Sequence, residues 1–229
     1  MPSSDVQFAE ELERVLPHDL PHRDRVIEKS ARHLELVVAA NEHMNLTRIT
    51  SPQEAAIKHV LDSIAPWAHF RESHTILDAG TGAGFPGIPL ALVLPTARFV
   101  LSESIGKKAR FVESAVDALE LSNIQVMPER AEAITTSRHV DIITARAVAP
   151  IAKILDLFHK PLKAGVRLLL YKGPDVEAEL DEARRHRLSA EVLCRYELPD
   201  GLGARSLVEI RASSAALGSP RKQAAATRR

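Results

Sequence analysis

The residues best suited to chemistry in this chain form a glycine-rich stretch, Asp78-Ala79-Gly80-Thr81-Gly82-Ala83-Gly84-Phe85-Pro86-Gly87. The apolar run 75–77 before it predicts a buried strand, and Pro86 is suited to the first turn of a helix ending near Pro95. Glycine lets the backbone approach a ligand closely and adopt positive φ angles. A strand, a glycine turn and a helix form the opening unit of a doubly wound nucleotide-binding sheet, where ligands bind beyond the carboxyl ends of the strands.

The spacing of these glycines separates the classes of nucleotide ligand. The dinucleotide fingerprint requires glycine three residues after Gly82, and the chain has Phe85 there. A P-loop is excluded because no Gly-Lys-Ser/Thr follows. The pattern Asp-x-Gly-x-Gly-x-Gly resembles motif I of the class I methyltransferases, which bind S-adenosylmethionine (SAM). The resemblance places Asp78, Gly80 and Gly82 in a cofactor site, with Asp78 bracing the loop.

Composition limits the other possibilities. Lys+Arg and Asp+Glu both total 30, so the chain has no overall positive charge to favour nucleic acid, although a local basic patch is compatible with this balance. One cysteine cannot build a disulfide framework, and no apolar run reaches the roughly 18 residues of a membrane span. The ten histidines are scattered along the chain, and the single cysteine leaves no Cys pair. We expect a cytoplasmic protein with no membrane segment and no metal site.

The periodicity of apolar residues predicts alternating strands and helices after an N-terminal helical region. Helices are expected near 5–16, 21–43 and 52–67, the last one beginning with the capping box Ser51-Pro52-Gln53-Glu54. Strands are expected near 74–78, 98–103, 124–127, 140–145, 165–171, 190–197 and 206–212, the last two as a hairpin. The predicted fold is α/β, a doubly wound seven-stranded Rossmann-like sheet. Its predicted parts are a helical extension (1–70), a SAM-binding domain (71–212) and a disordered basic tail (213–229).

Three strand ends carry further candidate residues. Glu103 ends the second strand, where a carboxylate in such sheets accepts hydrogen bonds from ribose hydroxyls. Ala131 and Glu132 follow the third strand, at the position that faces an adenine ring. Arg146 ends the fourth strand as the only charged residue in a small, mostly apolar stretch, next to the expected methyl group.

Two other features have ordinary interpretations. Lys58 and Asp62 lie at i and i+4 of a predicted helix, a spacing typical of a surface ion pair. Cys194 lies in a late strand outside any Pro-Cys loop and is expected to be a buried small hydrophobe, which disfavours covalent cysteine catalysis.

Several separated strings together resemble one family. In order they are Asn45-Leu46-Thr47, Lys58-His59 with Asp62-Ser63, the glycine stretch, Arg130-Ala131-Glu132 and Ala145-Arg146-Ala147. They resemble the RsmG (GidB) family, bacterial enzymes that methylate N7 of a guanine in the 530-loop region of 16S ribosomal RNA, over residues 40 to 212. The resemblance implies SAM contacts at Gly80, Phe85, Ala131, Glu132 and Arg146. It also implies that Asn45 and His59 lie near the mouth of the cofactor pocket. Arg205 resembles an arginine that the family retains after the hairpin turn.

Guanine N7 carries a lone pair and no proton, so this reaction needs no general base, in agreement with the absence of a candidate base in the motifs. Arg146 and Arg205 are the candidate catalytic residues, orienting the guanine or its phosphate. The expected partner is 16S ribosomal RNA, either naked or in the small subunit. Alternatives are a class I methyltransferase for another RNA, a protein or a small molecule, and an RNA-binding protein without activity. An NAD-dependent oxidoreductase is least favoured.

Overall fold

The computed structural model describes residues 4–147 and 149–213. The predicted tail, apart from residue 213, lies outside the described residues. Within them, seven strands form one sheet in the order β3-β2-β1-β4-β5-β7-β6. The strands are β1 (Thr75–Ala79), β2 (Arg98–Ser102), β3 (Ile124–Met127), β4 (Ile142–Arg146), β5 (Arg167–Lys172), β6 (Leu188–Glu197) and β7 (Ala204–Ala212).

The strands β1 to β5 are parallel, while β7 runs antiparallel to β5 and pairs with β6 as a hairpin. The sheet reverses its winding direction between β1 and β4, so their carboxyl ends border a crevice where such folds bind ligands. This arrangement confirms the predicted doubly wound α/β fold with a terminal hairpin.

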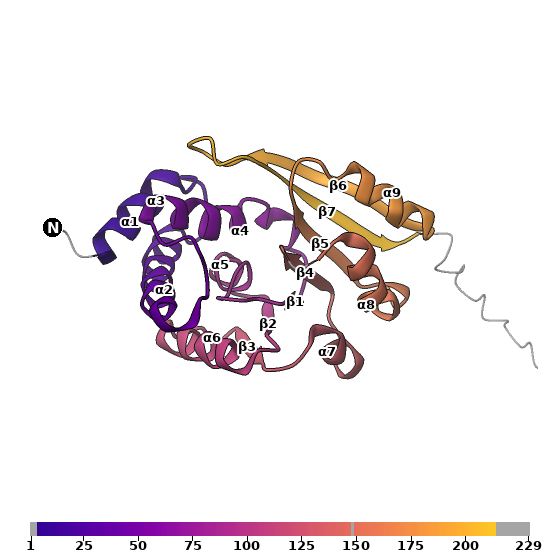
Figure 1. Cartoon of the computed structure of the whole chain (residues 1–229), viewed down its shortest axis with the longest axis horizontal. Coiled ribbons are helices and arrows are strands. Elements are labelled where there is room, and N and C mark those ends of the chain that lie inside the picture. Colours follow the sequence, from indigo (N-terminus) through magenta and orange to yellow (C-terminus); the bar gives the residue numbers. More distant parts are fainter. Residues whose placement is uncertain (1–3, 148, 214–229) are drawn as a thin grey trace, which may run out of the picture.

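Helices cover both faces of the sheet (Figure 1). The helices after β1 are α5 (Gly87–Val93), α6 (Gly106–Ala118), α7 (Ala131–Ser137), α8 (Ile151–Lys163) and α9 (Glu177–Arg185). Neighbouring residues of one strand alternate between two separate cores: Ile76 packs with α5 and α6, and Leu77 packs with α7 and α8. Burial on both faces explains why the central strands are nearly continuous apolar runs.

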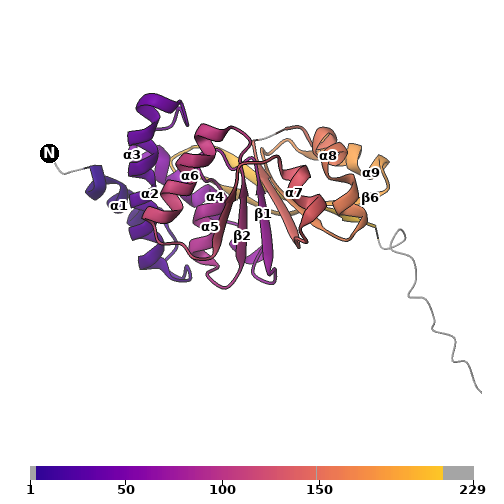
Figure 2. The ribbon, with the colours of Figure 1, turned by 90° about the horizontal axis from the view of Figure 1, so that it is seen from below.

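The N-terminal region comprises α1 (Ser4–Val15), α2 (Arg23–Met44) and a helical stretch between Pro52 and Ile64. Figure 2 shows α1 and α2 at one end of the molecule, with β1 and β2 in the middle. Phe8 of α1 and Leu34 of α2 belong to the same core as Ile88 of α5. The extension therefore shares its hydrophobic core with the sheet.

The helical stretch differs from the predicted uniform helix over 52–67. It consists of α3 (Pro52–Ala55), the π-helical segment η1 (Ala56–Leu61) and α4 (Asp62–Ile64), and a short 3₁₀ turn, η2 (Trp67–His69), follows. The predicted start is confirmed, because Ser51 Oγ accepts a hydrogen bond from the Glu54 N–H and Pro52 occupies the first turn. π-helical turns are rare and occur frequently at functional sites.

Because the core is shared, we predict that the extension and the sheet unfold in one transition. The Phe8→Ala substitution removes a ring that is 2% exposed, which should lower the free energy of unfolding by about 3–5 kcal/mol. Urea unfolding, followed by the fluorescence of the single tryptophan, Trp67, and by far-ultraviolet circular dichroism, should give coincident curves for the native chain. An early, separate transition of the helices would contradict the shared core.

Candidate active site

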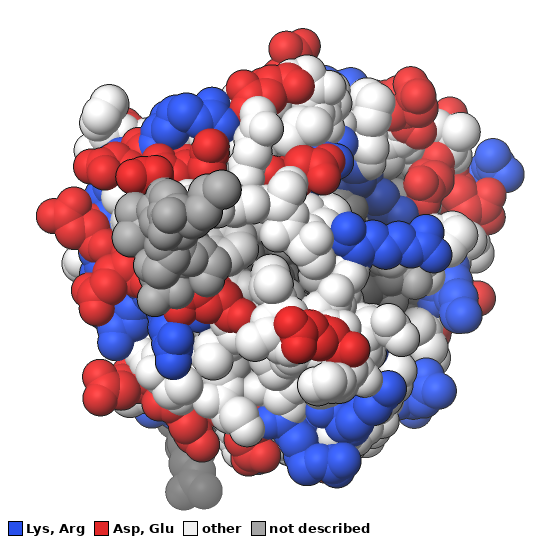
Figure 3. All heavy atoms as spheres, turned by 60° about the vertical axis from the view of Figure 1, so that its left-hand side comes forward, with Lys and Arg blue, Asp and Glu red and all other residues white. Residues whose placement is uncertain are grey.

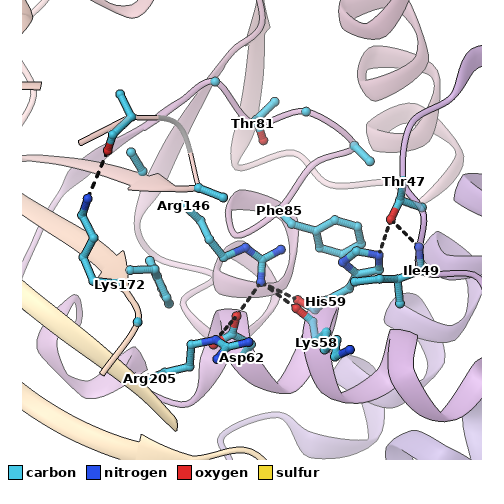
Figure 4. Close-up of a pocket in the computed structure, with 18 of the residues that line it drawn as sticks. Thr47, Ile49, Lys58, His59, Asp62, Thr81, Phe85, Arg146, Lys172 and Arg205 are labelled. Carbon is cyan, nitrogen blue, oxygen red and sulfur yellow. Dashed lines mark hydrogen bonds and ion pairs between the residues drawn. The ribbon is translucent and has the colours of Figure 1, made fainter. Parts of the chain in front are cut away.

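A cavity of about 630 Å³ opens at the carboxyl ends of β1, β4 and β5. This volume lies within the range of small-molecule and cofactor sites. Its walls come from the glycine loop after β1, the η1 segment, the ends of β4 and β5, and the start of β7 (Figure 4). The lining residues used below are Thr47, Lys58, His59, Asp62, Gly80, Gly82, Phe85, Arg146, Lys172 and Arg205.

The glycine loop is held by hydrogen bonds to Asp78, on the side away from the cavity. Its Oδ2 accepts hydrogen bonds from Thr81 Oγ1 at 2.7 Å and from the Gly87 N–H at 2.8 Å. A Cβ at Gly87 would collide with the Leu101 side chain and lie 2.7 Å from Asp78 Oδ2, so only glycine fits there. Asp78 lines neither cavity of the site. It acts on the loop, as expected for a bracing residue.

A smaller cavity of about 150 Å³ adjoins the first one and shares Gly80, Ala145 and Ile154 with it. Glu103, Ala131 and Glu132 line this space. Glu103 is buried, and its Oε1 accepts a hydrogen bond from the Ile105 N–H at 2.8 Å. The three residues predicted at the ends of β2 and β3 therefore meet beside the glycine loop.

Phe85 is enclosed by two histidines. The His59 ring stacks on it with 4.5 Å between centroids and 8° between planes, and the His33 ring of α2 lies 4.7 Å away at 32°. His33 Nε2 lies 2.8 Å from the Ala83 carbonyl oxygen, to which it donates a hydrogen bond. His33 thereby joins the N-terminal extension to the glycine loop, a contact that sequence patterns had not indicated.

The η1 segment supplies the main contacts of Arg146. The Asp62 N–H donates to the Ile57 carbonyl, five residues earlier, and so leaves the Lys58 carbonyl available. Arg146 Nη1 donates to this Lys58 carbonyl at 2.9 Å and to Asp62 Oδ2 at 3.2 Å. The carbon at the centre of the Arg146 guanidinium lies 5.7 Å from the centroid of the Phe85 ring.

The predicted surface pair of Lys58 and Asp62 is wrong. Lys58 Nζ pairs with Glu54 Oε1 at 2.5 Å, while Asp62 is buried and shared by two arginines. Its Oδ2 lies 3.2 Å from Arg146 Nη1 and 3.8 Å from Arg205 Nε. The π-helical turn changes the spacing on which the prediction depended.

The structure brings the two candidate catalytic arginines together and adds a residue that was missed. Arg146 and Arg205 approach the same carboxylate (Figure 4). Lys172, at the end of β5, also lines the cavity and donates from Nζ to Glu179 Oε2 at 2.8 Å. Its position at a strand end was the available signal. Asn45 is exposed and ends α2 in a left-handed conformation, while the following Leu46 and Thr47 line the cavity.

Other expectations concern absences and the cysteine. Across the described ranges, no group of three His, Cys, Asp or Glu side chains is arranged to hold a metal ion. None of the described helices is long and apolar enough to cross a membrane. Cys194 is half-buried in β6 and is therefore less enclosed than predicted. Burial raises the pKa of its thiol.

Comparison with known protein families assigns the chain to one of them. The family model "GidB: rRNA small subunit methyltransferase G" matches residues 26–200. The chain belongs to the GidB family. A curated GidB relative, ribosomal RNA small subunit methyltransferase G of Solibacter usitatus, is 58% identical over 208 residues, covering 89% of this chain and 99% of the relative. The protein of the same name from Carboxydothermus hydrogenoformans is 38% identical, covering 77% and 79%.

Solved structures relate the GidB fold to other methyltransferases. Magnesium protoporphyrin IX methyltransferase from Synechocystis PCC 6803, solved with bound SAM, has a TM-score of 0.56 at 16% identity, covering 79% of this chain and 97% of that one. The tRNA methyltransferase TrmK of B. subtilis also has a TM-score of 0.56, at 15% identity, covering 69% and 68%. At these identities the likeness shows the class I methyltransferase fold.

The buried histidines of this GidB chain predict a dependence of stability on pH. Burial lowers the pKa of His33 to about 4 and that of His59 to about 3, from 6.5. Below pH 6.5 the unfolded chain binds protons at both sites that the folded chain does not, so each histidine lowers the free energy of unfolding as pH falls. Asp78 opposes this trend below about pH 6, because burial raises its folded-state pKa to about 6.

The His33→Gln variant should therefore lose less stability than the native chain between pH 6.5 and about 4, by up to about 1.4 kcal/mol per pH unit. Urea unfolding at several pH values measures the slope. The His18→Gln substitution, at an exposed position, provides the control. Equal slopes for His33→Gln and the native chain would contradict a neutral, buried His33.

Proposed function

We propose that this chain transfers a methyl group from SAM to N7 of a guanine in the 530-loop region of 16S ribosomal RNA. One observation carries the proposal within the GidB family. Apart from Asp78, the residues predicted for the cofactor and those predicted for the base line two adjoining cavities, which have Gly80, Ala145 and Ile154 in common. This arrangement suits a cofactor that spans both spaces and presents its methyl group in the larger one.

The residues present fit SAM. Gly80 and Gly82 have φ angles of 74° and 62°, so the loop exposes backbone without side chains in the way. A Cβ at Gly82 would meet nothing within 4 Å, which leaves room beside the loop. Glu103 presents a carboxylate to the smaller cavity, suited to ribose hydroxyls, and Ala131 and Glu132 would border the adenine. When bound, SAM supplies an electrophilic methyl group on a cationic sulfur.

The protein's part in this mechanism is alignment. Guanine N7 attacks with its lone pair, so no side chain has to remove a proton. The buried groups near Phe85 agree with this: His59 is kept neutral, and the Asp62 carboxylate is engaged by two arginines. The cavity walls must hold the base about 3–3.5 Å from the methyl carbon and exclude water.

The two arginines give the cavity a positive charge for the RNA. Arg146 and Arg205 share one carboxylate, Asp62, so one positive charge is left over beside the cavity. Donation to N7 itself would block the reaction, so their contacts must go to guanine O6 or to phosphate. Their roles follow from these constraints: both orient the target nucleotide, and Arg146 also borders the cofactor.

A basic helix face beside the cofactor site is suited to RNA phosphates. Lys107, Lys108 and Arg110 follow Glu103 at the start of α6 and have no acidic partner among the ion pairs of the described residues. Figure 3 shows basic side chains gathered at the lower right of the face in view, whereas acidic and basic side chains are mixed over the rest of it. A local basic patch of this kind would orient the chain on ribosomal RNA even though its net charge is zero.

The test is transfer of labelled methyl from SAM to small ribosomal subunits and to naked 16S RNA, both from cells lacking the modification. Borohydride–aniline treatment cleaves at N7-methylguanine, and we expect one cleavage, within the 530 loop. Comparison of the two substrates shows whether ribosomal proteins are required. The Arg146→Ala variant should strongly reduce the turnover. SAM binding without label in either RNA would discard the substrate assignment and retain the methyltransferase.

The ribose contact predicts a loss of cofactor affinity in the Glu103→Gln variant. Loss of charged hydrogen bonds should weaken SAM binding on the order of ten- to a hundredfold. Isothermal titration calorimetry measures the dissociation constant. The exposed Glu129, which lines neither cavity, provides the matched control, because Glu129→Gln should bind SAM like the native chain. Equal affinities for both variants would remove Glu103 from the cofactor site.

A further inference from the structure

The guanidinium of Arg146 has one occupied edge and one free edge. Nη1 donates to the Lys58 carbonyl and to Asp62 Oδ2, and lies 3.5 Å from the His59 carbonyl oxygen. Nε and Nη2 have no hydrogen-bond partner in the part of the chain that the structure describes, although the side chain is only 15% exposed. A guanidinium is planar and rigid, so fixing one edge fixes the direction of the other. The free edge thus remains available to a ligand in the larger cavity.

Asp62 is itself held from several directions. Its Oδ1 accepts a hydrogen bond from the Tyr196 hydroxyl of β6 at 2.9 Å, while Oδ2 faces both Arg146 and Arg205. The Tyr196 hydroxyl also lies 3.2 Å from the Asp62 carbonyl oxygen. With 4% exposure, this carboxylate has little freedom to move. It joins the helical stretch, the end of β4 and the terminal hairpin at one point.

The π-helical turn is what places two acceptors together for Nη1. In an unbroken α-helix, the Asp62 N–H would occupy the Lys58 carbonyl. Here that N–H bonds to Ile57, and the Lys58 carbonyl and the Asp62 carboxylate both accept from Arg146. We propose that Asp62 is a positioning residue that holds the free edge of Arg146 toward the point where cofactor and target base meet. The proposal rests on the function proposed above.

The chain contains a matched control for this arrangement. Glu209 of β7 is also 4% exposed and also lies between two arginines. Arg167 Nε is 2.5 Å from its Oε1, and Arg211 Nε is 3.3 Å from its Oε2. Glu209 lines neither cavity. The Glu209→Gln variant therefore reproduces the loss of a buried, doubly paired carboxylate without touching the site.

The experiment compares Asp62→Asn with Glu209→Gln for thermal stability, SAM affinity, and kcat and KM of methyl transfer to 16S RNA. Both substitutions should lower the melting temperature. Only Asp62→Asn should lower kcat/KM, by on the order of tenfold or more, whereas Glu209→Gln should stay within twofold of the native chain. If the two folded variants lose activity equally, Asp62 is a structural residue and the proposal is overturned.

A double-mutant cycle tests whether the effect passes through Arg146. In the Arg146→Lys background, adding Asp62→Asn should change kcat/KM less than about twofold, because the group that Asp62 positions is already gone. A full, additive loss would overturn the proposed route.

If Asp62→Asn does not fold, Tyr196→Phe replaces it, since this variant keeps the carboxylate and removes one of its hydrogen bonds. A folded Tyr196→Phe variant with native kcat/KM would then overturn the proposal, and a loss that disappears in the Arg146→Lys background would support it. If the native chain methylates neither RNA substrate, the proposed function fails by itself. The same variants and the same cycle are then measured by SAM affinity, so the two failures are distinguishable.

Discussion

The ion pair between Asp62 and Arg146 is the interaction on which the geometry of the site depends. It connects a helix that precedes the sheet with the end of a central strand, and it forms where the helix contains a π-helical turn. A buried carboxylate is costly unless it is paired and hydrogen-bonded. Asp62 meets this condition with Arg146, Arg205 and Tyr196. Segments distant in sequence are thereby fixed around one cavity.

The faces of the sheet provide stability, and the carboxyl ends of its strands provide the site. Its faces are covered by two separate apolar cores, which provide stability. The carboxyl ends of its parallel strands carry the polar residues of the site, including Glu103 after β2, Arg146 at the end of β4 and Lys172 at the end of β5. Because a strand end is not part of the core, its side chain can be selected for chemistry without loss of packing.

Much of this fold could be predicted because its signals are local. The strand β3 has the predicted bounds, 124–127, and the other strands differ by a few residues. The glycine spacing indicated the loop, and the rule of strand ends indicated Glu103 and Arg146. The π-helical turn could not be predicted, because an apolar pattern does not show one backbone hydrogen bond skipping a residue. The spacing i, i+4 therefore paired Lys58 with Asp62, which the structure contradicts.

The contact of His33 with the Ala83 carbonyl could not be predicted from the sequence either, because the two residues lie 50 positions apart. This contact has a thermodynamic consequence. The conformation of the glycine loop and the docking of α2 are linked equilibria, and linkage acts in both directions. A cofactor that orders the loop must also stabilise the docked extension. Conversely, a macromolecular surface that binds the extension and shifts α2 must change the affinity for the cofactor. The factor equals the one by which the cofactor changes the affinity for that surface.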